Sequence, residues 1–232
     1  MTGAAGRLGI GIIGAGPVGP VLGRALAGAG HEILAISAVS DENRERAEAL
    51  LPGVPIRTPD EIVRDSQLVI FAIPAGELEA LVHGLTETGA WQPGQLVMHT
   101  AAAFGYGVFA PAMQSGVIPL AFHPAMVFSG TSLDLARLHE ATVAVTAPAP
   151  VLPIAQALAV EIGAEPVVVA EEARAEYADA TTALGELTAS LARQTVATLT
   201  DLGIEMSSRT VASIARAALD EVLLEAPRDE GL

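Results

Sequence analysis

Apolar residues fall into short runs over the first 170 positions of the chain, and these runs have the length and composition of buried β-strands. Glycine or proline follows several of them, as expected where a strand ends. The runs that we interpret as strands are Leu8–Ile13, Glu32–Ser37, Gln67–Ile73, Gln95–Thr100, Val117–Phe122, Thr142–Thr146 and Pro166–Ala170.

Segments with helical features lie between these runs. Pro17–Ala29 has proline in its first turn and glycine after its end, which is typical of a helix. The other helices that we expect here are Glu42–Leu51, Glu77–Leu85 and Val151–Ile162. The alternation of strands and helices predicts the α/β class, with a doubly wound parallel Rossmann sheet that carries helices on both faces.

The pattern changes after the last predicted strand. Residues 171–202 contain no proline, and apolar or small residues recur there at the spacing of one helix face. Such a helix would be about 48 Å long, and a second helix follows at Ser207–Leu224. We therefore predict a dinucleotide-binding Rossmann domain over residues 1–170 and a small all-α domain for substrate binding and dimerisation over residues 171–232.

The two C-terminal helices cannot enclose a core by themselves, so their apolar faces must pack against another surface. We expect a homodimer that forms through these helices. The alternative is that the helices dock onto the first domain of the same chain.

The first predicted strand leads into a glycine-rich motif, Gly14-Ala15-Gly16-Pro17-Val18-Gly19. A GxGxxG motif between a buried strand and a helix is typical of a dinucleotide-binding site. Gly14 allows a tight turn, Gly16 lets the backbone approach the pyrophosphate, and Gly19 lets the helix pack close to the strand. The helix start offers N–H groups to the phosphates, although Pro17 and Pro20 have none. We assign all six residues of the motif to cofactor binding; the alternative is a turn without a ligand.

The end of the second strand bears on the choice of cofactor. NAD sites usually place an acidic residue about 20 positions after the glycines, and residues 37–40 at that place include none. Serine and arginine suit the 2′-phosphate of NADP better. We therefore predict NADP, contacted by Ser40 and Arg44, with NAD as the alternative. Arg44 and Arg46 would otherwise belong only to the solvated face of a helix.

Composition excludes several classes of function. The formal net charge of −15 opposes binding to nucleic acid, and no apolar run reaches the roughly 18 residues of a membrane span. The N-terminus lacks the basic segment of a signal peptide, so we expect a cytoplasmic protein. There is no cysteine, and no convincing spacing of metal ligands, so we expect no metal. All 12 basic side chains are arginine, which excludes a catalytic lysine.

Candidate chemistry lies at the carboxyl ends of the strands, where ligands bind in open parallel sheets. We assign Ile73, Pro74 and Thr100 at two of these ends to cofactor binding. We assign His123, at a third strand end, to proton transfer on a small-molecule substrate, because imidazole titrates near neutral pH. Tyr177 on the long helix is the second candidate catalytic residue. A structural histidine and a core tyrosine are the alternatives.

These motifs together resemble the Rossmann-like NAD(P)-binding oxidoreductases of the 6-phosphogluconate dehydrogenase superfamily. The chain is similar to an uncharacterised group with a helical C-terminal domain, near pyrroline-5-carboxylate reductase, ketopantoate reductase and prephenate dehydrogenase. The resemblance implies an NAD(P)-dependent reductase or dehydrogenase that acts on a small carbonyl, imine or hydroxy acid. It rests on Gly14–Gly19, Ala49–Pro55, Val69–Pro74, His99–Thr100, His123–Thr131 and Ala217–Asp220.

The chain departs from that group where a substrate cleft is expected. Ala101-Ala102 replaces Ser-Gly, Ala178 replaces histidine, and Leu184-Gly185 replaces Ala-Asn. Each change removes a polar group or a wall of the cleft. Ketopantoate reductases also rely on a lysine that this chain lacks, whereas pyrroline-carboxylate reductases need none. The alternative function is therefore a catalytically inactive dinucleotide-binding sensor or scaffold homodimer.

Overall fold

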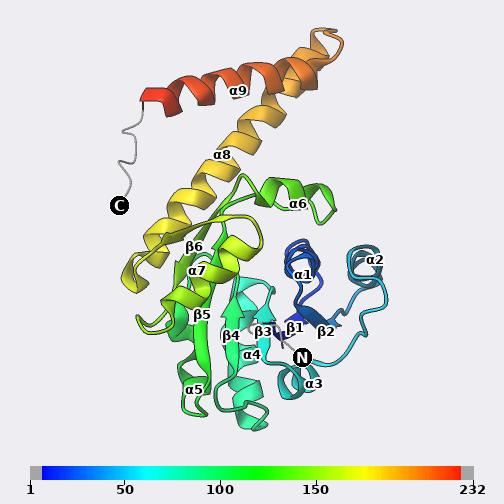
Figure 1. Ribbon diagram of the computed structural model, residues 1–232. Helices are drawn as coiled ribbons and strands as arrows, with labels where there is room; N and C mark the ends of the chain where they lie inside the picture. The colour runs from blue at the N-terminus through cyan, green and yellow to red at the C-terminus, as the bar shows by residue number, and fades with distance from the viewer. Residues whose placement is uncertain (1–6, 226–232) are drawn as a thin grey trace. The chain divides into compact units, whose positions relative to one another are not determined.

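The computed structural model describes residues 7–225, in which seven strands form one sheet. The order of strands across the sheet is β2-β1-β3-β4-β5-β6-β7 (Figure 1). This arrangement confirms the predicted α/β Rossmann class. The strands are β1 (Gly9–Ile13), β2 (Glu32–Ser37), β3 (Leu68–Phe71), β4 (Leu96–His99), β5 (Ile118–Pro124), β6 (Thr142–Thr146) and β7 (Glu165–Val168).

Helices connect the strands as far as β7, and two longer helices follow. The connecting helices are α1 (Gly19–Gly28), α2 (Asp41–Leu50), α3 (Pro59–Asp65), α4 (Ala75–Glu87), η1 (Tyr106–Phe109), α5 (Ala110–Met113), α6 (Leu133–Leu138) and α7 (Leu152–Glu161). After β7 come η2 (Glu171–Ala173), α8 (Arg174–Asp201) and α9 (Ser207–Glu225).

The sheet is not wholly parallel, which corrects the sequence-based expectation. β5 and β6 pair antiparallel, and every other neighbouring pair is parallel. The connection between them, which contains α6, brings the chain back beside the end of β5. There the Ala125 N–H donates to the Thr142 carbonyl oxygen at 2.9 Å, and Pro124 pairs with Val143. β6 therefore starts next to the carboxyl end of β5 and runs in the opposite direction, which needs no crossover along the length of β5.

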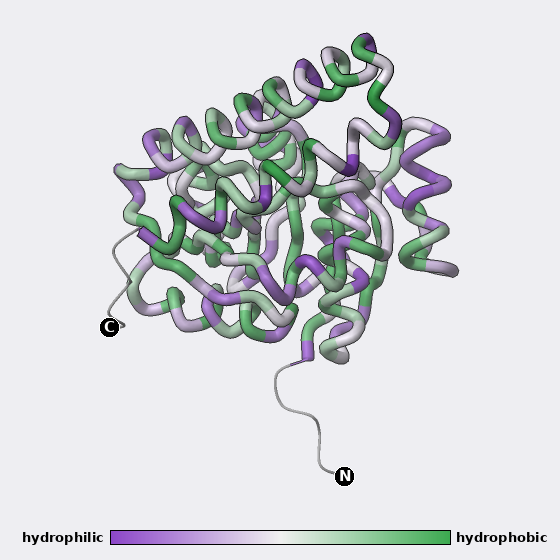
Figure 2. Tube along the Cα trace, turned by 90° about the horizontal axis from the view of Figure 1, so that it is seen from above, coloured by the Kyte–Doolittle hydropathy of each residue, from purple (hydrophilic) through white to green (hydrophobic). Residues whose placement is uncertain are grey.

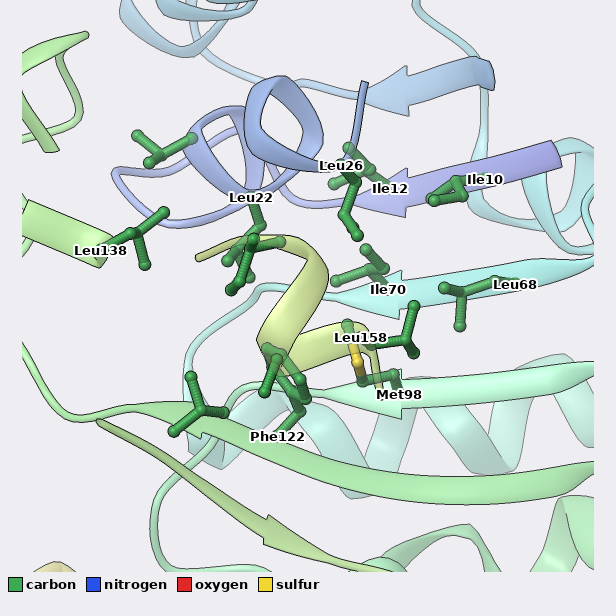
Figure 3. Close-up of a cluster of buried hydrophobic side chains, with 14 of the residues drawn as sticks. Ile10, Ile12, Leu22, Leu26, Leu68, Ile70, Met98, Phe122, Leu138 and Leu158 are labelled. Carbon is green, nitrogen blue, oxygen red and sulfur yellow. The ribbon is translucent and has the colours of Figure 1, made fainter. Parts of the chain in front are cut away.

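Both faces of the sheet carry a hydrophobic core, because the strand residues alternate in direction. One core contains Ile12, Ile70 and Met98 with side chains of α1, α6 and α7 (Figure 3). The opposite core contains Val69 and Phe71 with side chains of α3, α4 and η1. Burial on both faces explains why the strands read as continuous apolar runs in the sequence.

The start of α1 and the presence of α3 differ from the expectation. α1 begins at Gly19 instead of Pro17, which places Pro20 in its first turn, where a missing N–H costs nothing. The short helix α3 was not predicted, although its sequence carries a start signal. Pro59 is its first residue, and the Glu61 carboxylate accepts a hydrogen bond from the Thr58 N–H at 2.9 Å.

The chain divides into a unit that ends at Asp179 and a unit that begins at Ala180. α8 has 28 residues, or about 42 Å, because η2 takes the first three residues of the predicted helix. The second unit consists of the rest of α8 and α9, and many of its apolar side chains are exposed. The functional boundary predicted between residues 170 and 171 stays a prediction.

Membrane-spanning helices are absent from residues 7–225, because no helix there is both long and apolar enough. Figure 2 shows hydrophilic residues interrupting the hydrophobic ones along the helices.

Candidate functional site

The glycine motif lies at the point where the chain direction across the sheet switches. β1 has β2 on one side and β3 on the other, so the chain passes from β1 to β2 on one side and then crosses to β3 on the other. Ligands of open α/β sheets bind at such a switch point, beyond the carboxyl ends of the strands. Residues 14–18 follow β1 there and lead into α1.

The three glycines of the motif serve different purposes. Gly14 has a φ of +106°, and a Cβ on it would collide with the Ala72 carbonyl oxygen. A Cβ on Gly19 would collide with the Gly14 carbonyl oxygen, so this glycine lets α1 pack against the turn. A Cβ on Gly16 would meet no atom within 4 Å. The packing of the protein therefore requires Gly14 and Gly19 but not Gly16, where the backbone is open to the approach of a ligand.

A cavity of about 880 Å³ opens beside this motif. Its volume lies in the range of small-molecule and cofactor sites. The sequence-predicted residues that line it are Gly14, Ala15, Gly16, Pro17, Val18, Ile73, Pro74 and Thr100. These residues follow β1, β3 and β4, which are neighbours in the sheet. The cavity and the open Gly16 together fit a nicotinamide dinucleotide, with its pyrophosphate at the start of α1.

Three predicted cofactor residues lie outside the cavity lining. Gly19 is buried beneath the turn. The Ser40 hydroxyl caps α2 by accepting a hydrogen bond from the Asn43 N–H at 3.2 Å. Arg44 is exposed on the first turns of α2. Contacts of Ser40 and Arg44 with a 2′-phosphate stay predictions.

Arg46, rather than Arg44, reaches the glycine motif. Its Nη1 donates to the Ala15 carbonyl oxygen at 3.1 Å, and its Nη2 pairs with Glu42 at 2.6 Å. This arginine therefore ties α2 to the motif.

Sequence reasoning missed Ser37 and Asn43 in the lining of the cavity. The Ser37 hydroxyl accepts a hydrogen bond from the Gly14 N–H at 2.9 Å. This contact follows from the strand register, because Ser37 pairs with Ile13 immediately before Gly14. The other lining residues that we did not predict are Ile13, Ala38, Val39, Pro59, Ala72, Glu77 and Leu81.

The two predicted catalytic side chains lie in contact. His123 is near the end of β5, and its Nδ1 is 2.9 Å from the Tyr177 hydroxyl. The two rings meet edge to face, with their centroids 5.6 Å apart. Both side chains are half-buried. β5 neighbours β4, which ends before Thr100, so the pair belongs to the same edge of the sheet as the cavity.

Burial and a nearby cation set the protonation of this pair. Burial and the Arg174 guanidinium lower the pKa of His123 to about 4. Burial raises the pKa of Tyr177, and Arg174 opposes that rise. Near neutral pH the imidazole is therefore neutral and the phenol protonated, and the tautomer of His123 decides which of the two groups donates this hydrogen bond.

His99 has a structural role at the end of β4. Its Nδ1 accepts a hydrogen bond from the Ala101 N–H at 3.2 Å, so its Nε2 carries the proton and donates to the Gly105 carbonyl oxygen at 2.9 Å. The Glu171 carboxylate accepts hydrogen bonds from the N–H groups of Tyr106 and Gly107 at 2.9 and 2.8 Å. These contacts hold the segment that follows β4. Within residues 7–225 no cluster of side chains could hold a metal ion.

Two family models match successive segments of the chain. Residues 3–124 match the family described as Rossmann-like domain, and residues 141–230 match a domain of unknown function, DUF2520. Over 107 residues the chain is 33% identical to an NAD(P)+ glycerol-3-phosphate dehydrogenase of Lactobacillus delbrueckii subsp. bulgaricus. That alignment covers 40% of this chain and only 30% of that enzyme.

Solved structures share the fold over nearly the whole chain. A Bacteroides fragilis protein provisionally assigned as an NADP oxidoreductase has a TM-score of 0.73 at 18% identity, with 97% of this chain and 82% of that chain covered. An imine reductase of a Pseudomonas species has a TM-score of 0.72 at 14% identity, with coverages of 95% and 76%. The NADP-bound pyrroline carboxylate reductase of Plasmodium falciparum has a TM-score of 0.65 at 10% identity, with coverages of 96% and 80%.

Proposed function

The chain belongs to the family of Rossmann-like domains, and from that premise we propose that it is an NADP-dependent oxidoreductase acting on a small carbonyl, imine or hydroxy acid. One observation carries the proposal. A cavity with an open glycine cradle and a hydrogen-bonded His–Tyr pair lie at the same edge of one sheet. The similar structures include reductases whose names specify an imine, a pyrroline carboxylate or NADP.

The glycine motif would hold the pyrophosphate of the cofactor. Backbone N–H groups at the start of α1 face the phosphates, and Gly16 leaves room for them. Ser37 and Asn43 line the end of the cavity beside α2, where the adenosine ribose belongs in this fold. A bound nicotinamide cofactor supplies the hydride chemistry. We assign NADP because the exposed Arg44 directly follows Asn43 and Ser40 lies three residues before it.

His123 and Tyr177 supply the proton in this proposal. The Tyr177 hydroxyl donates to the oxygen or nitrogen of the reduced bond, and His123 holds the phenol in place by donating its Nδ1–H to the phenol oxygen across 2.9 Å. The neutral imidazole also provides a route by which a proton returns to the phenol. No lysine is needed for this chemistry, in agreement with a chain in which all 12 basic residues are arginine.

A second copy of the chain is the partner that we propose for the C-terminal helices. Leu184, Leu187 and Leu191 on α8 are 62%, 70% and 67% exposed. On α9, Ile214 and Val222 are 63% and 65% exposed. Apolar side chains at this density mark an interaction surface, and a homodimer buries the same face of both chains.

Turnover with a panel of cyclic imines, oxo acids and hydroxy acids tests the proposed function. We expect oxidation of NADPH with at least one imine or oxo acid. Tyr177→Phe should lower kcat at least about a hundredfold, because general acid catalysis contributes that much, while NADPH affinity stays unchanged. Tyr106→Phe is the matched control, since it removes the other of the two tyrosines. Tight NADPH binding without turnover of any substrate would favour the sensor or scaffold instead.

A further inference from the structure

Arg174 is a fully buried cation at the start of α8, with 1% of its surface exposed. Its Nε donates to the Thr146 hydroxyl at 2.7 Å, and its Nη2 donates to the Ala144 carbonyl oxygen at 3.0 Å. A longer contact of 3.4 Å joins Nη2 to the Ala121 carbonyl oxygen. The guanidinium therefore links α8 to β5 and β6 through hydrogen bonds to uncharged oxygen atoms.

The positive charge of Arg174 has no carboxylate partner within residues 7–225. The ion pairs found there all involve other residues. Its Nη1 is buried and has no hydrogen-bond partner in the same part of the chain. Glu171 is the acidic residue whose charge acts on the pKa of Arg174. Its carboxylate accepts hydrogen bonds from the N–H groups of Tyr106 and Gly107 instead of pairing with the guanidinium. Burying a charge without an opposite charge beside it destabilises the fold, and structural hydrogen bonds alone do not require a charged donor.

Tyr177 is the aromatic side chain that faces this charge. The Arg174 Cζ lies 5.9 Å from the centre of the Tyr177 ring. The hydroxyl of the same ring contacts His123 at 2.9 Å. Arg174 is one helical turn before Tyr177, so α8 fixes the spacing of the two side chains.

We propose that Arg174 is a positioning residue whose unpaired charge stabilises the phenolate that Tyr177 becomes when it gives up its proton. This inference rests on the proposed function and names the group that makes its proton donor effective. In a protein interior of low dielectric constant, a positive charge that is already in place stabilises the negative charge that develops in the transition state. It lowers the activation barrier because no groups have to reorient during the reaction. This role requires that Arg174 has no carboxylate partner, because the negative charge of a partner would cancel the electric field of the guanidinium at the Tyr177 phenol.

The proton-transfer step balances with the hydride of a reduced nicotinamide as co-reactant. The hydride and its electron pair go to the carbon of the C=N or C=O group. The O–H bond of Tyr177 breaks, and its proton joins the nitrogen or oxygen. The electron pair of that bond stays on the phenolate, next to Arg174. Protonation from solvent through His123 restores the phenol.

Other titratable groups around this cluster do not supply the same field. His123 on β5 and His99 on β4 each have a pKa of about 4, so they are neutral near pH 7. Glu171 of η2 is acidic, so it supplies no positive charge. β6 contributes the neutral Thr146. Among these groups of residues 7–225, Arg174 is therefore the one whose charge favours the phenolate.

The pKa of Tyr177 tests this proposal without substrate or cofactor. In a Tyr106→Phe background Tyr177 is the sole tyrosine, and NMR of a protein carrying ζ-¹³C tyrosine reports its ionisation. Arg174→Gln should raise that pKa by about one pH unit or more, as expected for loss of a unit charge at this range. Arg174→Lys should restore most of the change. Arg64→Met, which removes an exposed arginine of α3, should leave it unaltered.

A second pair of variants keeps Arg174 itself, in case Arg174→Gln does not fold. Thr146→Asp places a carboxylate beside Arg174 Nε and should raise the pKa of Tyr177, whereas Thr146→Asn should not. An unchanged pKa of Tyr177 in Arg174→Gln or in Thr146→Asp would overturn the proposal.

Turnover is measured separately: Arg174→Gln should lower kcat about tenfold or more at nearly constant KM. A protein without turnover contradicts the proposed function, and the titration still decides the role of Arg174.

Discussion

The residues of the glycine motif carry two kinds of constraint. At Gly14 and Gly19 a side chain would collide with backbone carbonyl oxygens, whereas at Gly16 it would point into open space. Folding thus accounts for two of the glycines, and we propose that cofactor binding accounts for the third.

Alanine substitutions separate these two constraints. Gly19→Ala should lower the free energy of unfolding by more than about 2 kcal/mol, because the Gly14 carbonyl oxygen must shift to admit the new Cβ. Gly16→Ala should change it by less than about 0.5 kcal/mol, since Gly16 has no positive φ and its Cβ meets no atom within 4 Å. Urea unfolding of both variants measures the difference. Equal losses of stability would show that Gly16 is also a packing residue.

His99 makes the stability of the fold depend on pH. Burial is the main cause that lowers its pKa from 6.5 to about 4. As pH falls through 6.5 the unfolded chain takes up a proton that the folded chain does not, so the free energy of unfolding falls until about pH 4. This histidine alone accounts for a loss of about 3 kcal/mol over that window, roughly 2 kcal/mol of it by pH 5.

Urea unfolding between pH 8 and pH 5 checks this expectation. His99→Gln should flatten the slope in part, because His123 titrates in the same sense. His83→Gln is the control, since His83 is exposed on α4 and should leave the slope unaltered. A wild-type free energy of unfolding that stays constant from pH 8 to pH 5 would contradict the buried, neutral histidines.

At the scale of elements, the sequence was most informative where local pattern decides structure. Continuous apolar runs predicted the strands, and the glycine motif was recognised from its place between β1 and α1. The direction of β6 depends on where the connection after β5 returns to the sheet, beside the end of β5, which no local pattern reveals. Ser37 and Arg174 escaped prediction for a similar reason. Their contacts depend on strand register and on residues 23 to 53 positions away in the chain.

The start of α2 is the element that we expect to select the cofactor. Arg44→Ala should weaken NADPH binding about tenfold, the loss of one charge-assisted hydrogen bond, and should leave NADH binding unaltered. Arg24→Ala on α1 is the control, because Arg24 is also exposed. Both dissociation constants can be measured by fluorescence of the bound nicotinamide. A parallel loss for NADPH and NADH would place Arg44 outside the 2′-phosphate site.

At the scale of the whole molecule, the exposed leucines of α8 are the basis of the homodimer that we propose. We expect a dimer in sedimentation equilibrium, and the double variant Leu187→Glu and Leu191→Glu should shift it to monomer, because charges do not tolerate burial in an apolar interface. The matched control is Leu133→Glu with Val160→Glu, two residues of α6 and α7 that are 68% and 61% exposed. A monomeric wild-type chain would contradict the proposed partner.

Titration of the purified protein with NADPH and with NADH tests the central claim most directly, because every proposed step needs a bound nicotinamide. We expect saturable binding of NADPH, tighter than that of NADH. Gly16→Val should abolish binding while the variant stays folded by circular dichroism, since its side chain would occupy the open space at the cradle. A folded wild-type protein that binds neither dinucleotide, or a Gly16→Val variant that binds NADPH as tightly as the wild type, would contradict the assignment of this cavity as a cofactor site.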